Sequence, residues 1–544
     1  MTSTTTTTSG PAGRPGAETT EPRTYGNWRK PSTPGLPGLG LLGTVAALGG
    51  VVLVVLVQML AGLLPALVVL AVVAAAVLPL LYRNRSGRNG WQAAAARVLW
   101  LRGRRARQHL FRSGLLAPAT CGGTTLPGLL APSVLYEAVD AYGAPFALLH
   151  IPATRHYSVV LRCDPEGSAL VDPETSDTWV ARWGRWLAEL PREPHLEAAS
   201  ATVETAPDPG SRLAREVQQL LTDGAPELAR RMLTEVADTY ALGSPQVTGR
   251  VSLTFTATRR VSEDSELFAG RTTNTTGSGE GAAAGGKSAR RARVLTPAEM
   301  AAQIGSRLPA LLRELASTGA GGVRALTAAE LAQTVRVAYD PAAGPVLDGL
   351  HAHGQDPQVD WAGAGPAGQL EGWGSLRHDT GTSVTWQMTE APRGAVQSQV
   401  LRAILEPCGE LTRKRVTLLY RPHDPASAAR IADADVRTAL GKATMRKGET
   451  RAQESSDLTA ARQTAGEEAA GAGLTRFSLL VTATVTDPAG LAHAADLIDQ
   501  AGGASRLRLR RVYAGQSAFF AAALGVGLVL PAHVAVPAVL RQYL

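Results

Sequence analysis

The stretch Leu39–Tyr82, LGLLGTVAALGGVVLVVLVQMLAGLLPALVVLAVVAAAVLPLLY, contains no charged residue. The uncharged region as a whole runs from residue 31 to residue 82. A helix needs about 20 apolar residues to cross a bilayer, so the region is long enough for two crossings. It therefore predicts a two-helix transmembrane hairpin over residues 31–82, with helices at about 39–60 and 64–82.

Positive charge is concentrated on the carboxyl side of this region. Only Arg23, Arg29 and Lys30 precede it closely, whereas nine arginines follow between Arg83 and Arg112. The positive-inside rule assigns such flanks to the cytoplasm. We therefore expect a multi-pass protein of the cytoplasmic membrane, with its N- and C-termini in the cytoplasm.

The region 83–113 is predicted to form a basic juxtamembrane helix. No Asp or Glu occurs from Pro22 to Tyr136, and the apolar residues Trp91 and Trp100 are interleaved with arginines. A helix of this kind lies at a membrane interface and attracts anionic lipid. Nucleic acid is the alternative partner for the same charge. The predicted lipid-interface residues are Arg83, Arg85, Arg88, Arg97, Arg102, Arg104, Arg105 and Arg107.

The first 30 residues are rich in Thr, Pro and Gly and have no apolar periodicity. We expect residues 1–30 to be a disordered N-terminus. The net charge of the 544-residue chain is +8, and nearly all of its positive charge is arginine. This composition suits phosphate and lipid head groups, although GC-rich coding alone would also produce it.

The rest of the chain alternates strand-like and helix-like stretches, which predicts an α+β cytoplasmic body. A first α+β domain is expected over 114–260, where RVSLTFTATRR alternates apolar and polar residues like a strand with one buried face. A flexible Gly-rich linker is expected over 261–295. A second α+β region, 296–425, begins with the capping boxes of Thr296 and Thr327.

Two further units complete the predicted body. Alternating charges over 426–472 indicate a solvent-facing helical hairpin. Residues 473–544 read as strand, helix and strand, followed by a C-terminal helix, with Asp487 capping the middle helix. Together with KRVTLLYRP this order predicts a ferredoxin-like, split βαβ sheet, and the earlier strands repeat the pattern.

A phosphate-loop pattern occurs in GAAAGGKS, Gly281–Ser288. A working phosphate loop leaves a buried strand and enters a helix directly, so that backbone N–H groups converge on the phosphates. TTNTTGSGE precedes this stretch, and the next helix cap comes only at Thr296. We therefore place Lys287 and Ser288 in a linker, and keep a membrane-anchored NTPase as an alternative.

No catalytic, cofactor-binding or metal-binding residues are predicted, and the protein is expected not to be an enzyme. Cys121, Cys163 and Cys408 are too far apart in sequence for a zinc site or a disulfide framework. His351 and His353 alternate in a segment rich in glycine and proline, which favours a surface loop over a metal site.

Two parts of the chain resemble type IV secretion (conjugation) machinery of the actinobacterial kind. YGNWR ahead of the hairpin, over Tyr25–Arg112, is similar to the PrgI-type inner-membrane subunit, and the βαβ unit ending in QSAFFAAALGVG, over Arg476–Gly527, is similar to the amino-terminal domain of VirB-type ATPases. Gly525 departs from the proline usual in those ATPases, and no motor domain follows Gly527.

The resemblance implies a non-catalytic inner-membrane scaffold that works as part of an oligomeric assembly. It further implies that a separate ATPase and a polytopic channel protein are its partners. The EccE-type component of type VII secretion is the second family that the chain resembles, because it also has two early membrane helices and a cytosolic body.

Overall fold

The computed structural model describes most of the chain outside the amino terminus. The described residues are 25–26, 40–81, 89–113, 126–165, 167, 171–207, 216–217, 220–222, 224–240, 245–258, 294–392, 394–444 and 452–534. The predicted linker up to residue 293, the phosphate-loop pattern, Cys121 and all of residues 1–30 except Tyr25–Gly26 lie outside them.

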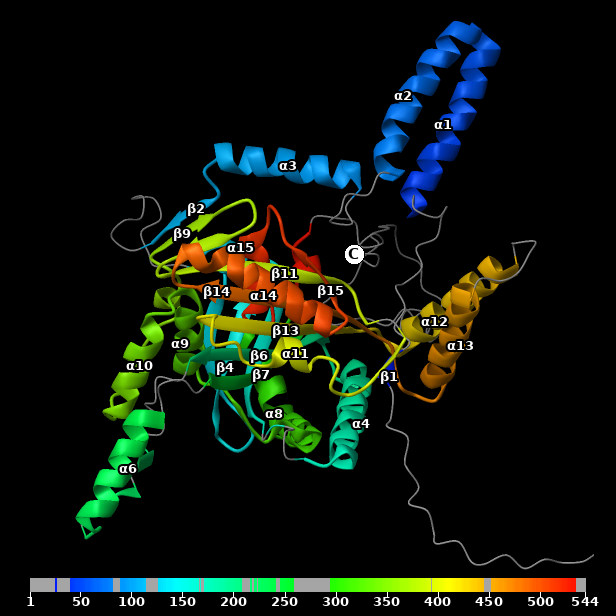
Figure 1. Ribbon diagram of the computed structural model, residues 1–544. Helices are drawn as coiled ribbons and strands as arrows, with labels where there is room; N and C mark the ends of the chain where they lie inside the picture. The colour runs from blue at the N-terminus through cyan, green and yellow to red at the C-terminus, as the bar shows by residue number, and fades with distance from the viewer. Residues whose placement is uncertain are drawn as a thin grey trace, which may run out of the picture.

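The body is a mixed α and β structure built on one 13-stranded sheet in which every strand pair is antiparallel (Figure 1). The predicted α+β class is confirmed. The main path runs β2-β9-β10-β11-β14-β13-β6-β7-β5-β4-β3, with β15 beside β11 and β8 beside β5. The bounds are β2 Leu110–Arg112, β3 Val134–Val139, β4 Pro145–Ile151, β5 His156–Asp164, β6 Leu196–Pro207, β7 Pro245–Thr256, β8 Gly322–Ala325, β9 Gly368–Glu371, β10 Leu376–His378, β11 Gly381–Glu390, β13 Arg413–Pro422, β14 Thr475–Val485 and β15 Arg508–Arg511.

The sheet contains the same strand order twice. The first set is β8-β5-β7-β6, with helices α4 (Pro173–Glu189) and α8 (Pro297–Leu315) in its crossovers. The second set is β15-β11-β14-β13, with α11 (Arg402–Leu405) and α14 (Leu491–Ala504) in the same places. Antiparallel pairing of β6 with β13 joins the two sets into one sheet.

Both sets place their crossover helices on the same face of the sheet. Leu418 packs in the α11/α14 core, Ala201 packs against the α4/α8 core, and these two residues are cross-strand partners. The core around α8 contains Met300 and Ile304 together with strands β4 to β7. The boundary expected between 114–260 and 296–425 therefore falls inside one packed core.

The opposite face is covered by α9 (Ala328–Tyr339), α15 (Gln516–Ala523) and the chain that follows α15. Phe520 is fully buried against Tyr339. The C-terminal helix expected from the sequence is thus present as α15, inside the body. We call Gln516–Leu530 the C-terminal strap.

The face beneath the strap is lined with hydroxyl groups. Val251, Leu253 and Phe255 of β7 are buried, as the alternation predicts, but Ser252 and Thr254 on its other side are buried too. The sequence pattern predicts one buried and one polar face for β7, and the structure buries the polar face as well, because the strap covers it. Thr254 and Ser158 donate hydrogen bonds to the Gly527 carbonyl, and Thr417 donates to that of Ala523.

Other predictions need local correction. The sequence GAVQSQVLRAILEP, residues 394–407, predicts a helix. It contains instead strand β12 (Ala395–Val396), which pairs with β1 (Tyr25–Gly26), and only the single turn α11. The terminal β-α-β-α-β order was also incomplete, because β11 lies between β14 and β15.

Helical insertions leave the sheet at the equivalent hairpin of each set. The β6–β7 connection carries α6 (Glu227–Tyr240), and the β13–β14 connection carries α12 (Pro425–Thr444) and α13 (Ala452–Ala469), which pack against each other. Because β6 and β13 are antiparallel, the insertions point to opposite sides of the body (Figure 1). α10 (Ala343–Ala352) follows α9.

Candidate membrane interface

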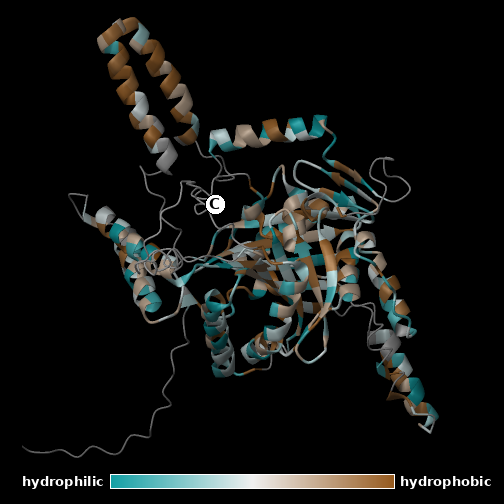
Figure 2. Ribbon diagram, turned by 180° about the vertical axis from the view of Figure 1, so that it is seen from behind, coloured by the Kyte–Doolittle hydropathy of each residue, from teal (hydrophilic) through white to brown (hydrophobic). Residues whose placement is uncertain are grey.

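Two apolar helices project away from the body (Figures 1 and 2). α1 (Gly40–Ala61) and α2 (Leu63–Leu81) pack against each other, and Gly62 between them has a positive φ of 87°. Their contact is close, because a Cβ on Gly50 would lie 2.5 Å from Val73 Cγ1. Glycine therefore makes both the turn and the close approach.

Most apolar side chains of this helical pair are exposed. Met59 is 84% exposed and Leu64 is 79% exposed. Among the described residues one segment, Leu63–Leu80, is long and apolar enough to cross a bilayer, and the described apolar part of α1 is the shorter Ala47–Ala61. Such a large exposed apolar surface marks an interface with lipid or protein.

The third helix, α3 (Gly90–Arg105), lies between this pair and the sheet (Figure 1). Asn89 caps it in a capping box with Gln92. The Trp91 indole Nε1 donates a 2.8 Å hydrogen bond to the Ala76 carbonyl of α2, and a Cβ on Gly90 would meet Pro79. The start of α3 is therefore fixed to the end of α2.

Aromatic contacts attach the other side of α3 to the body. The rings of Trp100 and Trp373 meet edge to face with centroids 5.8 Å apart, and Trp373 stacks on Tyr513 at 5.9 Å. Ala93, Ala96, Trp100 and Gly103 are the partly buried positions on this side. At about 100° per residue, the opposite side of α3 carries Trp91, Val98, Leu101, Arg102 and Arg105. All five of these residues are exposed, and we call the side that they form the free side of α3, because it faces away from the body.

The structure places five of the predicted lipid-interface residues on or directly after α3. Arg97, Arg102, Arg104, Arg105 and Arg107 are all exposed, and none forms an ion pair with another described residue. Arg83, Arg85 and Arg88 lie outside the described residues. The helix predicted for 83–113 ends earlier than expected, because Leu110–Arg112 form the edge strand β2.

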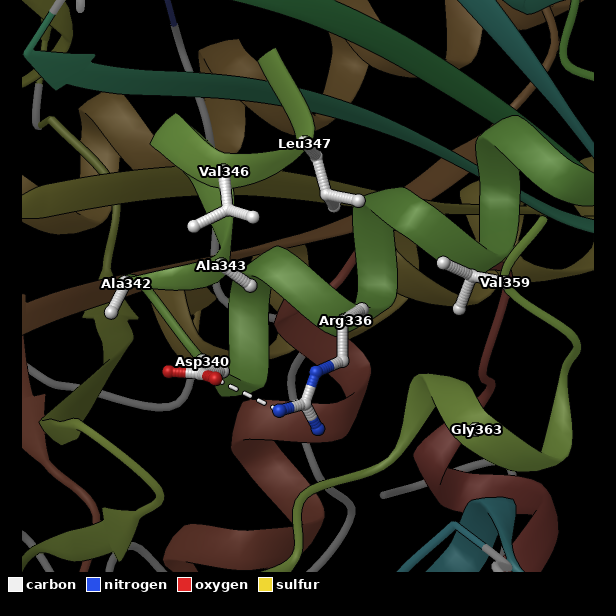
Figure 3. A pocket seen from close by; sticks show the side chains of 8 residues that line it. All are labelled: Arg336, Asp340, Ala342, Ala343, Val346, Leu347, Val359 and Gly363. Atoms are coloured by element: carbon white, nitrogen blue, oxygen red, sulfur yellow. Dashed lines mark hydrogen bonds and ion pairs between the residues drawn. The ribbon is translucent and has the colours of Figure 1, made fainter. Parts of the chain in front are cut away.

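A pocket lies elsewhere, between α9 and α10. It has a volume of about 350 Å³ and is lined mainly by alanine, valine and leucine side chains (Figure 3). Arg336 is its one cation, and its guanidinium contacts Asp340 and Asp379 and donates to the Gly365 carbonyl. The guanidinium of Arg336 is therefore already paired within the protein. The residues that line the pocket include no nucleophile paired with a base.

The histidines considered for a metal site do not meet. His351 contacts Gln333, while His353 contacts the Gly349 carbonyl at the end of α10. His378 is buried, donates from Nδ1 to the Tyr339 carbonyl and accepts from the Ser383 hydroxyl, and burial lowers its pKa to about 4. Within the described ranges, no three His, Cys, Asp or Glu side chains form a metal-binding group.

One buried cluster was not predicted from the sequence, Glu204 with Arg250, Arg413 and Arg415. The strand β6, which carries Glu204, was not recognised. A usable signal was present in KRVTLLYRP, where arginines on one side of a strand require a partner if that side is buried.

Part of this interface is similar to a known domain family. Residues 32–92 match a domain of unknown function (DUF8461). The match spans α1, α2 and the first residues of α3. No curated protein matches the chain.

Proposed function

We propose that the protein is a non-catalytic scaffold of the cytoplasmic membrane, a component of a secretion apparatus similar to type IV (conjugation) systems. α1 and α2 would cross the bilayer as a two-helix transmembrane hairpin, with both chain termini in the cytoplasm. α3 would lie on the anionic inner leaflet. The body would recruit cytoplasmic partners, including a separate ATPase and a polytopic channel protein, in an oligomeric assembly.

One observation carries the proposal: the exposed apolar helical pair joins a basic helix that is fixed to the body on one side only. Trp91 and Arg105 on the free side of α3 match the residue types that favour a bilayer interface. The free side is therefore suited to a membrane surface at the base of the helical pair.

The arrangement of the body supports a partner-binding role. We infer that the two strand sets are ferredoxin-like subdomains, and that the α12/α13 helical hairpin and α6 are arms for docking. Leu228, Met232 and Val236 form an exposed apolar stripe at intervals of four residues along α6. Exposed stripes of this kind commonly bind partner helices.

An EccE-type component of type VII secretion is the second candidate. It is favoured by the direct succession of an apolar helical pair and a large α and β body. The two candidates differ in the partner that co-purifies with the chain, a conjugation-type ATPase or type VII machinery.

Membrane topology tests the anchor. A reporter fused after Gly62 is expected to lie on the external side of the membrane. A reporter fused after Ser113 is expected to lie in the cytoplasm. A fusion after Ser113 that is active outside, or recovery of the intact protein in the soluble fraction, would overturn the proposal.

Affinity purification from native membranes tests the scaffold role. The wild-type protein is expected to retain secretion subunits, and Leu228→Ser with Met232→Ser on α6 is expected to reduce their recovery. Val346→Ser, an exposed apolar position on α10 and outside both proposed arms, is the matched control for nonspecific loss. Purification of the wild-type protein without any secretion subunit contradicts the scaffold role.

A further inference from the structure

A cluster of three arginines around one glutamate lies where the two strand sets meet. Glu204 of β6 is the cross-strand partner of Arg415 on β13, and Arg250 comes from β7. The Glu204 carboxylate accepts from Arg250 at 2.5 Å, from Arg413 at 2.8 Å and from Arg415 at 3.1 Å. One carboxylate therefore holds three guanidinium groups together.

The cluster is deeply buried. The side chains of Arg415, Glu204 and Arg250 are 1%, 4% and 8% exposed, and that of Arg413 is 17% exposed. Burial alone would raise the pKa of Glu204, but the three arginines lower it well below its usual range. The carboxylate is therefore ionised, and Arg413 is the member closest to solvent.

The charges do not balance. Arginine stays protonated in proteins, so three cations and one anion leave a surplus of two positive charges. No other described acid forms an ion pair with any of the three arginines. Arg415 lies 5.5 Å from the centroid of the Phe520 ring, and this cation–π contact stabilises one of the charges only slightly. Burying an uncompensated charge costs several times more free energy than such a contact returns.

Hydrogen-bond donors are also left over. Among the described residues, Arg250 Nε, Arg413 Nε, and Arg415 Nε and Nη1 are buried without an acceptor. Buried polar groups in native proteins are almost always satisfied. The unmatched donors and the unmatched charge belong to the same three side chains, so both require one additional anion with several acceptor atoms.

We propose that this cluster is a binding site for a phosphate-type oxyanion. A dianionic tetrahedral group neutralises the surplus of two charges and accepts from several guanidinium N–H groups at once. The anion approaches from the Arg413 side, because the Arg413 side chain is the most exposed member of the cluster, at 17%. The ion joins the two strand sets, and its source is free phosphate or the phosphomonoester of a nucleotide.

Ligand-induced stabilisation tests the proposal on the full-length protein in detergent. Inorganic phosphate is expected to raise the unfolding temperature in a saturable way, as binding to the native state requires. Sodium chloride at matched ionic strength is the control. Equal responses to phosphate and chloride overturn the proposal. Tighter binding of AMP than of phosphate assigns the site to a nucleotide, and equal binding assigns it to the free ion.

Variants locate the site. Arg413→Gln removes the least buried donor and is expected to weaken phosphate binding about tenfold or more, the effect of losing one charge-assisted hydrogen bond. Arg162→Gln on β5 is the matched control, because Arg162 is the cross-strand partner of Arg250 but pairs with Asp164. Equal weakening in both variants contradicts the site.

Calorimetric titration of the wild-type protein with phosphate gives a readout that does not depend on how any variant folds. Sulfate, which has the same shape and charge, is expected to compete with phosphate. A titration without saturable heat overturns the proposal even if Arg413→Gln fails to fold.

Discussion

The helical pair α1/α2 and the central sheet differ in which side chains they expose and which they bury. In the helical pair, apolar side chains such as Met59 and Leu64 are exposed, whereas in the sheet polar side chains such as Ser252 and Thr254 are fully buried. Figure 2 shows the contrast as a hydrophobic pair of helices outside a body of mixed colour. Each region therefore contains an exception to the rule of apolar inside and polar outside.

The difference shows what each region requires from its surroundings. The sheet satisfies its buried hydroxyl groups internally, through pairs such as Ser200–Ser252 and Thr385–Thr482 and through the carbonyls of the strap. The helical pair buries little of its apolar surface within the chain and therefore needs an apolar environment from elsewhere. Substitutions in each region test this contrast.

The largest effect is expected at Glu204. Glu204→Ala leaves three buried arginines without their shared carboxylate and should destabilise the body by about 3–5 kcal/mol, measured by denaturant unfolding of the detergent-solubilised protein. Glu189→Ala is the control, because its ion pair with Arg192 is exposed, and should cost at most about 0.5 kcal/mol. Similar losses in the free energy of unfolding for both variants would mean that the buried cluster stabilises the fold no more than an exposed ion pair does.

A charge in the middle of α2 tests the environment of the helical pair. Val72 is exposed, so Val72→Arg costs almost nothing in water, but about 2.5–3.5 kcal/mol at the centre of a bilayer. We expect less protein in the carbonate-resistant membrane fraction. Leu228→Arg on α6 is the matched exposed control and should leave that fraction unchanged. If the membrane fraction of Val72→Arg equalled that of the wild-type protein, the middle of α2 would not lie in an apolar environment.

The contact between strap and sheet is tested at Gly527. Its φ is 85°, and a Cβ there would lie 2.3 Å from Ser158 Oγ and 2.5 Å from Thr254 Oγ1. Gly527→Ala should therefore destabilise the body by about 1–3 kcal/mol, measured as a lower unfolding midpoint. Gly490→Ala, with a φ of −72° and an open surrounding, should leave the midpoint nearly unchanged.

Acid should weaken the body through two buried histidines. Burial lowers the pKa of His156 and of His378 from 6.5 to about 4, so the unfolded chain binds more protons than the folded one between these values. Stability is therefore complete above about pH 6.5 and is lost as pH falls towards 4, by about 1 kcal/mol per histidine at pH 5.5.

Unfolding midpoints measured from pH 7 to pH 5 check this dependence. His378→Gln should flatten it, and His493→Gln, at an exposed position on α14, should not. A midpoint independent of pH in the wild-type protein would contradict the neutral, buried state of both rings.

The smallest effect is expected at the free side of α3. Arg105→Gln should lower the attraction of α3 to an anionic bilayer by about 1 kcal/mol. In anionic nanodiscs, trypsin should therefore cleave α3 faster in this variant than in the wild-type protein. Arg185→Gln on α4 is the exposed control. If the wild-type protein were cleaved at equal rates in anionic and zwitterionic nanodiscs, α3 would not bind the membrane surface through its charge.

Local signals in the sequence predicted local structure well. The capping boxes of Thr296 and Thr327 begin α8 and α9, and Asp487 caps the helical segment ahead of α14. These succeed because a cap depends on residues only three positions apart. The apolar run before Arg83 likewise predicted the two helices α1 and α2.

Long-range pairings could not be predicted in the same way. The serines and threonines of β7 have the pattern of a solvent-exposed face, and only the strap, more than 250 residues later, makes that face buried. The Glu204 cluster depends on the pairing of β6 with β13, which no local pattern encodes. The exposed arginines of α3 followed from composition alone, but which of them point away from the body depends on Trp100 meeting Trp373.

The strap has a consequence for how the chain matures on the ribosome. It is synthesised long after α2, and it contacts β5 and β7 of the first strand set as well as β11 and β13 of the second. Neither set can close its hydroxyl-lined face during translation until those late residues emerge. The helical pair is by then already synthesised, so the body is the last part of the chain to complete its core.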